Sequence, residues 1–129
     1  MESLIQQSPI KVVNGYQLGT SRSDLDTTDL VNGAGMFADS SMDSVPPLCL
    51  SNLVNGRNMF AGCIQLTTVD GTNFGFESLE NGFQMFAKCS ALTTIKGSGN
   101  WDMSHARDLR GMFTGCGALT SFDASHWNL

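Results

Sequence analysis

The chain has 129 residues, of which 41% are hydrophobic, and this size suits one domain with a continuous core. Only 15% of the residues are charged, and the 14 glycines favour a turn-rich architecture over a bundle of long helices. The formal net charge of -5 offers no basic surface to neutralise phosphates, so neither nucleic acid nor an anionic membrane is expected as a partner.

The N-terminal segment, residues 1–27, is predicted to cap the domain. Residues 10–18 read as a β-hairpin, because the Asn14-Gly15 pair is the favoured two-residue turn between short strands. The start of the chain has neither a basic region nor an apolar stretch of the kind found in signal peptides, and no run in the sequence is long and apolar enough for a transmembrane helix. We therefore expect synthesis in the cytoplasm without a signal peptide.

Residues 28–129 repeat one sequence pattern four times, with approximate bounds of 28–52, 53–78, 79–105 and 106–129. Each copy contains a Met-Phe pair, and the pairs follow one another after 23, 26 and 27 residues: Met36-Phe37, Met59-Phe60, Met85-Phe86 and Met112-Phe113. One unit of about 25 residues cannot bury its own apolar side, whereas stacked units share a core. The repeat therefore predicts a stack of similar layers.

Within each copy we predict a short helix or helical turn over the Met-Phe segment, followed by a turn and a short strand. The strands are expected to pair in parallel and to point one hydrophobic residue each toward the core; these are Val45, Val69, Ile95 and Phe122. The Asn-Gly pairs before the Met-Phe segments are interpreted as bends, because Asn and Gly tolerate positive φ. The predicted class is α/β: a short leucine-rich-repeat-type solenoid with a parallel ladder of short strands and an N-terminal β-hairpin cap.

The fourth copy has the most regular motif. Read with the residues just before it, this copy gives Trp101-Asp102-Met103-Ser104, then Met112-Phe113-Thr114-Gly115-Cys116, and then Leu119-Thr120-Ser121-Phe122-Asp123. This order resembles the BspA-type leucine-rich repeat family, and the similarity extends over roughly residues 28–129 while fading toward the first copy. The resemblance implies a solenoid of the kind found on bacterial and protist surface proteins and in phage-encoded proteins. It implies adhesion or protein binding and no reaction.

Residues with catalytic or metal-binding potential fall on positions of the repeat. Cys63, Cys89 and Cys116 recur at the repeat period, so we expect inert thiols in a buried column, and no Cys-x-x-Cys pair is present. His105 and His126 lie beside the tryptophan motifs, where surface loops are expected. We therefore predict no enzymatic activity, no cofactor and no metal site.

The outward side of the strands is the predicted interaction face. Trp101 and Trp127 stand at corresponding positions one repeat apart; if buried they close the layer, and if exposed they can anchor a partner. We expect partial burial and include them as candidates. The predicted interaction residues are Thr68, Asp70, Thr94, Lys96, Ser121, Asp123, Trp101 and Trp127.

These features predict a non-catalytic protein-interaction or structural module whose partners are proteins, including further copies of the chain or virion proteins. Because a surface-type repeat occurs without a secretion signal, the preferred setting is a phage virion component on the virion surface, such as a capsid decoration or tail-associated protein. A fragment of a bacterial cell-surface adhesin is the alternative. A hydrolase of cell-surface polymers is a third hypothesis. The sequence does not support it, because it contains neither paired glutamates nor a Gly-x-Ser-x-Gly motif.

Overall fold

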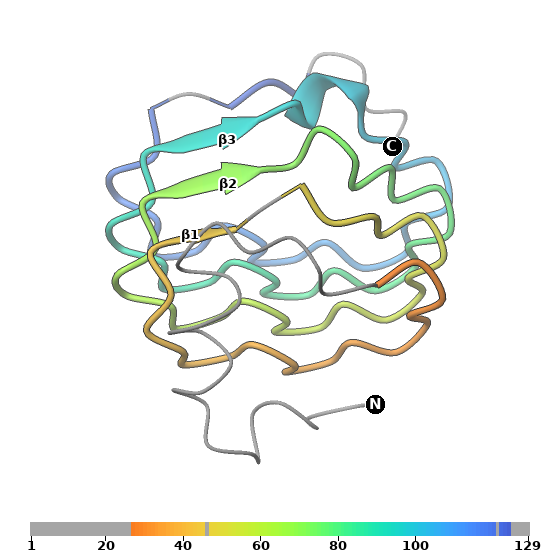
Figure 1. Ribbon diagram of the computed structural model, residues 1–129, viewed down its shortest axis with the longest axis horizontal. Coiled ribbons are helices and arrows are strands. Elements are labelled where there is room, and N and C mark those ends of the chain that lie inside the picture. The colour runs from red at the N-terminus through yellow and green to blue at the C-terminus, as the bar shows by residue number, and fades with distance from the viewer. Residues whose placement is uncertain (1–26, 46, 121, 125–129) are drawn as a thin grey trace.

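The strands of the described residues form a small parallel sheet. The computed structural model describes residues 27–45, 47–120 and 122–124. Strands β1 (Ser44–Val45), β2 (Thr68–Asp70) and β3 (Thr94–Lys96) lie in the order β1-β2-β3, and a 3-10 helix, η2 (Ser98–Asn100), follows β3 (Figure 1). The predicted hairpin over residues 10–18 lies outside the described residues.

The register of the sheet joins equivalent positions of successive repeats. Val45 pairs with Val69, and Val69 pairs with Ile95. All three side chains are at most 3% exposed, so the predicted inward ladder is confirmed for them. Phe122, the fourth member, is half-buried and packs against the same core. Because each pair joins segments one repeat apart, the chain returns to the same side of the molecule once per repeat.

A second ladder of cross-repeat hydrogen bonds runs along the Met-Phe segments. The N–H groups of Gly35 and Phe37 donate to the carbonyl groups of Arg57 and Met59, and later repeats continue the pattern. The intervening N–H groups bond three residues back, as in β-turns. We call the surface formed by residues 34–39, 57–62, 83–88 and 110–115 the turn face.

The helical part of the predicted α/β class is absent from the described residues, in which η2 is the one helix. Alternate N–H groups of the Met-Phe segments bond to the next repeat, so they cannot form the i→i−4 ladder of an α-helix. Each segment also contains two residues with positive φ, which a right-handed helix does not accommodate; they are Gly35, Asp39, Asn58, Gly62, Gln84, Lys88, Gly111 and Gly115. Within the described part of the chain no helix has the length and apolar character needed to cross a membrane.

Stacked aromatic rings fill the core behind the turn face. The rings of Phe37, Phe60, Phe86 and Phe113 follow one another with centroid separations of 5.4, 5.2 and 5.5 Å. The first three are fully buried. Burial of one such side chain stabilises a fold by roughly 1.5–3 kcal/mol, so the Met-Phe repeat makes a large contribution to core stability.

The Asn-Gly pairs stand at bends, as predicted, but not because of positive φ. Gly33, Gly56 and Gly82 are buried, and none of them has a positive φ. The side chain of Asn55 accepts the N–H of Arg57 at 3.0 Å, which forms the bend, while a Cβ on Gly56 would lie 2.3 Å from the Cε atom of a buried methionine. Asn thus shapes the turn, and Gly leaves room for the core.

Candidate interaction surface

The structure brings four predicted interaction residues together on β2 and β3. Thr68 and Lys96 are exposed, and Asp70 and Thr94 are half-buried. Thr68 pairs in register with Thr94, and Asp70 with Lys96. We call the outward surface of β1, β2 and β3 the strand face. Asp123 is exposed near η2 and lines a second hollow of about 570 Å³ together with Thr94 and Lys96, whereas Ser121 and Trp127 lie outside the described residues.

Several polar side chains at the strand face bond within the fold. The carboxylate of Asp70 accepts the hydroxyl of Thr72 at 2.6 Å and its N–H at 3.2 Å. The hydroxyls of Thr67 and Thr93 donate to carbonyl groups of the preceding repeat at 3.1 Å, and the backbone N–H of each threonine donates to that same carbonyl. These groups stabilise the stack, so their hydrogen bonds are already made within the fold and are not available to a partner.

Trp101 is a core residue, so it is not part of the interaction face that the sequence predicts. Its side chain is 2% exposed, and its ring lies 4.8 Å from that of Phe76 in a T-shaped arrangement. The indole N–H donates to the carbonyl of Gly71 at 2.9 Å. A Cβ on Gly71 would come within 2.7 Å of the indole, so the glycine makes room for it. Burial is more complete than expected because the indole N–H finds a partner inside the core.

The cysteines of the last three repeats form a column in which each thiol bonds to the preceding repeat, and a hydrogen bond with Cys89 lowers the pKa of the half-buried Cys116 to about 7. All four cysteines, Cys49 included, are free. The thiols of Cys63, Cys89 and Cys116 donate to phenylalanine carbonyl groups of the preceding repeat at 3.3, 3.2 and 3.1 Å. Hydrogen bonds with the thiols of Cys116 and Cys63, followed by burial, raise the pKa of Cys89 above its ordinary value, so this thiol stays neutral.

The turn face contains a groove that crosses the first three repeats. Its volume is about 450 Å³. Small side chains keep it open, since an alanine follows each of the first three Met-Phe pairs. The small lining residues are Ala34, Gly35, Ala38, Ala61, Gly62 and Ala87, and the polar ones are Asp39, Arg57, Asn58, Gln84 and Lys88.

Four of the polar lining residues adopt backbone conformations that usually favour glycine. Asp39, Asn58, Gln84 and Lys88 have φ values of 61°, 55°, 53° and 65°. The equivalent positions of other repeats are glycines with positive φ. A side chain in this conformation costs roughly 1–2 kcal/mol, less for Asn and Asp. The groove therefore carries polar side chains where the fold alone would favour glycine, a feature that is common at binding sites.

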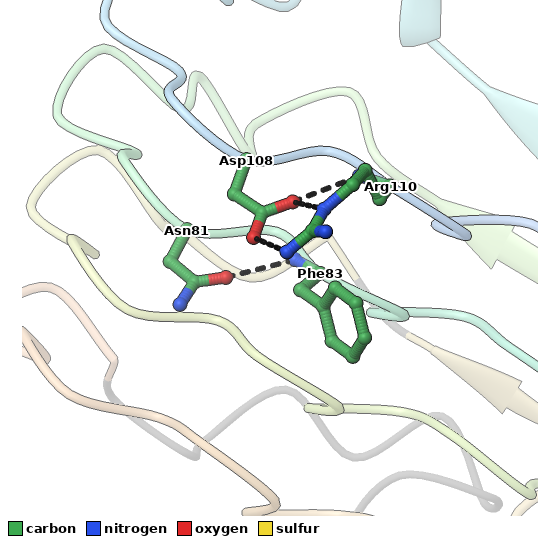
Figure 2. A network of polar contacts seen from close by, with 4 residues as sticks. All are labelled: Asn81, Phe83, Asp108 and Arg110. Atoms are coloured by element: carbon green, nitrogen blue, oxygen red, sulfur yellow. Dashed lines mark hydrogen bonds and ion pairs between the residues drawn. The ribbon is translucent and has the colours of Figure 1, made fainter.

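A row of charged and aromatic side chains lies beside the groove. The guanidinium carbon atoms of Arg57 and Arg110 lie 4.3 and 5.3 Å from the centroid of the Phe83 ring, within cation–π distance. Asp108 holds Arg110 by two hydrogen bonds of 3.0 and 2.9 Å, and Asn81 accepts the N–H of Phe83 at 2.9 Å (Figure 2). The side-chain hydrogen bond from Arg110 lowers the pKa of the Asp108 carboxyl group.

The sequence contains a partial signal for this surface. Arg57, Phe83 and Arg110 each stand two residues before the methionine of their repeat, so an alignment of the repeats puts them in one column. The groove itself has no sequence signature, because it depends on the β-turns that replace the predicted helices.

The repeats, the sheet and the polar outer surfaces define a class of protein, that of stacked sequence repeats. The chain belongs to the family described as "Mycoplasma protein of unknown function, DUF285", whose model matches residues 17–127. This family is related to the BspA-type repeat proteins that the sequence resembles. No curated protein and no solved structure matches the chain.

Proposed function

We propose that the chain is a BspA-like solenoid that acts as a non-catalytic protein-interaction module. Two sets of cross-repeat hydrogen bonds, in the sheet and along the turn face, support a solenoid because each repeat bonds to the next. The family match over residues 17–127 supports the BspA-like assignment. In this proposal the partner is a protein, and the chain binds it without catalysing a reaction.

The groove on the turn face is the observation that carries the proposal. Neighbouring layers lie roughly 4.7–4.9 Å apart, so the distance from the first layer to the third is about 10 Å. An extended polypeptide rises about 3.3 Å per residue, so about three residues of a partner chain fit along the groove. Its volume of about 450 Å³ lies in the range of known ligand sites.

The setting of this interaction is a second part of the proposal. We place the module first on the surface of a phage virion and second on a bacterial cell surface. The family description names a bacterium and assigns no activity, which accords with both settings. Mass spectrometry of purified virions would reveal the chain in the first setting, and surface biotinylation of intact cells would label it in the second. Absence from both preparations would contradict the proposed setting.

A matched pair of substitutions tests the groove as the binding surface. Ala61→Tyr puts a large side chain on the groove, and Thr68→Tyr puts the same side chain on the strand face. Proteins captured from virions or cell extracts by the immobilised chain are compared for both variants after confirming that each is folded. We expect Ala61→Tyr to abolish capture and Thr68→Tyr to retain it. Loss of capture with Thr68→Tyr and retention with Ala61→Tyr would indicate that the strand face is the binding surface.

A further inference from the structure

We infer that the groove on the turn face binds an extended acidic peptide segment of a partner protein. Arg57 and Lys88 would pair with its carboxylates, and Asn58 would accept one of its backbone N–H groups. This inference rests on the proposed function and specifies the chemical character of the partner segment. Its support comes from three features of the groove: unpaired cations, a preorganised guanidinium and a buried acceptor without a donor.

The cations of the groove are unpaired within the described residues. Arg57 and Lys88 both line the groove, and neither lies within ion-pair distance of a carboxylate there. Arg110, by contrast, is held by Asp108 at 2.9 Å. The one acidic residue that lines the groove is Asp39, so the lining carries two positive charges and one negative charge, a balance of +1. In a chain with a net charge of -5, this local excess favours an acidic ligand.

The guanidinium of Arg57 is held in place before any ligand binds. It lies over the ring of Phe83 at 4.3 Å, and the Asn55 side chain fixes the backbone N–H of Arg57 at 3.0 Å. A side chain that is already ordered loses less conformational entropy on binding. The planar N–H donors of the Arg57 guanidinium can then bind a carboxylate with two hydrogen bonds.

Asn58 distinguishes a peptide from a simple anion. Its side-chain oxygen is buried and has no hydrogen-bond donor among the described residues. A buried acceptor without a partner destabilises the protein, and a turn of the Asn58 amide toward the groove would let a ligand donor remove that penalty. Peptide backbones supply N–H donors beside their carboxylate side chains, whereas fully ionised inorganic anions supply acceptors. The groove therefore fits an acidic peptide better than a free anion.

The probe for this inference is a pair of synthetic peptides, acetyl-Ala-Glu-Ala-Glu-Ala-amide and its glutamine counterpart. Each peptide is titrated into the full ¹⁵N-labelled chain, and the backbone amide shifts are followed by NMR. We expect the glutamate peptide to shift the amides of Ala61, Gly62 and Ala87 and to bind at least tenfold more tightly than the glutamine peptide. Equal binding of the two peptides, or shifts confined to the strand face, would overturn the inference.

Three variants assign the roles of the individual residues. Lys88→Gln is expected to weaken binding of the glutamate peptide about tenfold, and Asn58→Asp is expected to abolish it, because a carboxylate repels the ligand. Asp tolerates positive φ as Asn does, so the backbone is preserved. Lys96→Gln removes a cation from β3 and is the matched control, with unchanged binding. An equal loss in the control would contradict a groove site, as would the same amide shifts with inorganic phosphate alone.

Failure of this inference can be told apart from failure of the proposed function. If Ala61→Tyr abolishes protein capture while the glutamate peptide produces no shifts, the interaction module stands and the acidic specificity is wrong. If neither protein capture nor peptide binding responds to changes in the groove, both fail.

Discussion

The strand face and the turn face are built from the same repeats but use their polar side chains differently. On the strand side, the hydroxyls of Thr67 and Thr93 reinforce the cross-repeat ladder, and the carboxylate of Asp70 binds Thr72. On the turn face, the guanidinium of Arg57 has no ion-pair partner and the side-chain oxygen of Asn58 has no donor among the described residues. Exposure alone therefore does not identify a binding surface. Unsatisfied polar groups around a hollow are the stronger indication.

The largest expected effect lies in the core behind the strand side. Trp101→Ala removes a buried indole and leaves the carbonyl of Gly71 without its donor, so we expect the free energy of unfolding to fall by about 3–5 kcal/mol. Thr68→Ala on the strand face should change it by less than about 0.5 kcal/mol. Urea denaturation followed by fluorescence or circular dichroism measures both. Similar small losses for the two variants would mean that Trp101 is dispensable for the core.

The next effect tests backbone conformation on the turn face. Gly62 has a φ of 76°, and a Cβ there would overlap the carboxylate of Asp39. We expect Gly62→Ala to lower the free energy of unfolding by about 2–3 kcal/mol, from left-handed strain and this overlap together. In an Asp39→Gly background the loss should shrink to about 1 kcal/mol, the strain alone. Additive losses in this double-mutant cycle would show that the two residues do not interact.

A smaller loss of stability is expected to distinguish two threonines near the strand face. Thr93→Val keeps the side-chain shape but removes the hydroxyl that donates to Thr67, so a loss of about 0.5–1 kcal/mol is expected. The neighbouring Thr94→Val is the control and should be nearly neutral, because within the described part of the chain its hydroxyl contacts the Thr93 hydroxyl of the same repeat at 3.4 Å and makes no cross-repeat hydrogen bond. Thermal and chemical denaturation of both variants provide the test. A larger loss for Thr94→Val would show that the wrong threonine column had been assigned to the fold.

The smallest effect concerns the ion pair beside the groove. The side-chain hydrogen bond from Arg110 lowers the pKa of Asp108, so the pair stabilises the fold above the ordinary carboxyl pKa and weakens as pH falls through the lowered value. Arg110→Gln should bring the pKa of Asp108 back toward its ordinary value. Asp102 is the control, since the Ser104 hydroxyl lowers its pKa instead. NMR titration of the carboxyl carbons would measure both, and an unchanged Asp108 would rule out Arg110 as the cause.

The sequence predicts the strands well because two periodicities agree there. The alternation within each strand and the spacing of the repeats both put Val45, Val69 and Ile95 at one inward position, and one register satisfies them together. Equivalent reasoning gives the aromatic column of the Met-Phe pairs. The turn face is harder to predict, because Met-Phe-Ala is equally suited to a helical turn and to a run of β-turns. Its conformation is decided by hydrogen bonds between repeats, which no single repeat reveals.

The groove illustrates what a one-dimensional pattern leaves out. Glycines at positive φ are common enough to be expected, but Asn58, Gln84 and Lys88 at equivalent positions look in the sequence like ordinary polar substitutions. Their significance appears once the backbone shows that glycine would be less strained. For Trp101 the sequence predicts partial burial and a possible anchor rather than full burial, because it does not reveal that Gly71 offers the indole a buried acceptor.

The most direct test of the turn face as the binding surface is site-specific photo-crosslinking. A photoreactive amino acid replaces Gln84 in the groove in one variant and Thr68 on the strand face in the other. Both are irradiated with purified virions or cell extract, and crosslinked products are identified by mass spectrometry. We expect a discrete protein adduct from position 84 and none from position 68. An adduct from position 68 alone would contradict the account and assign the interaction to the strand face.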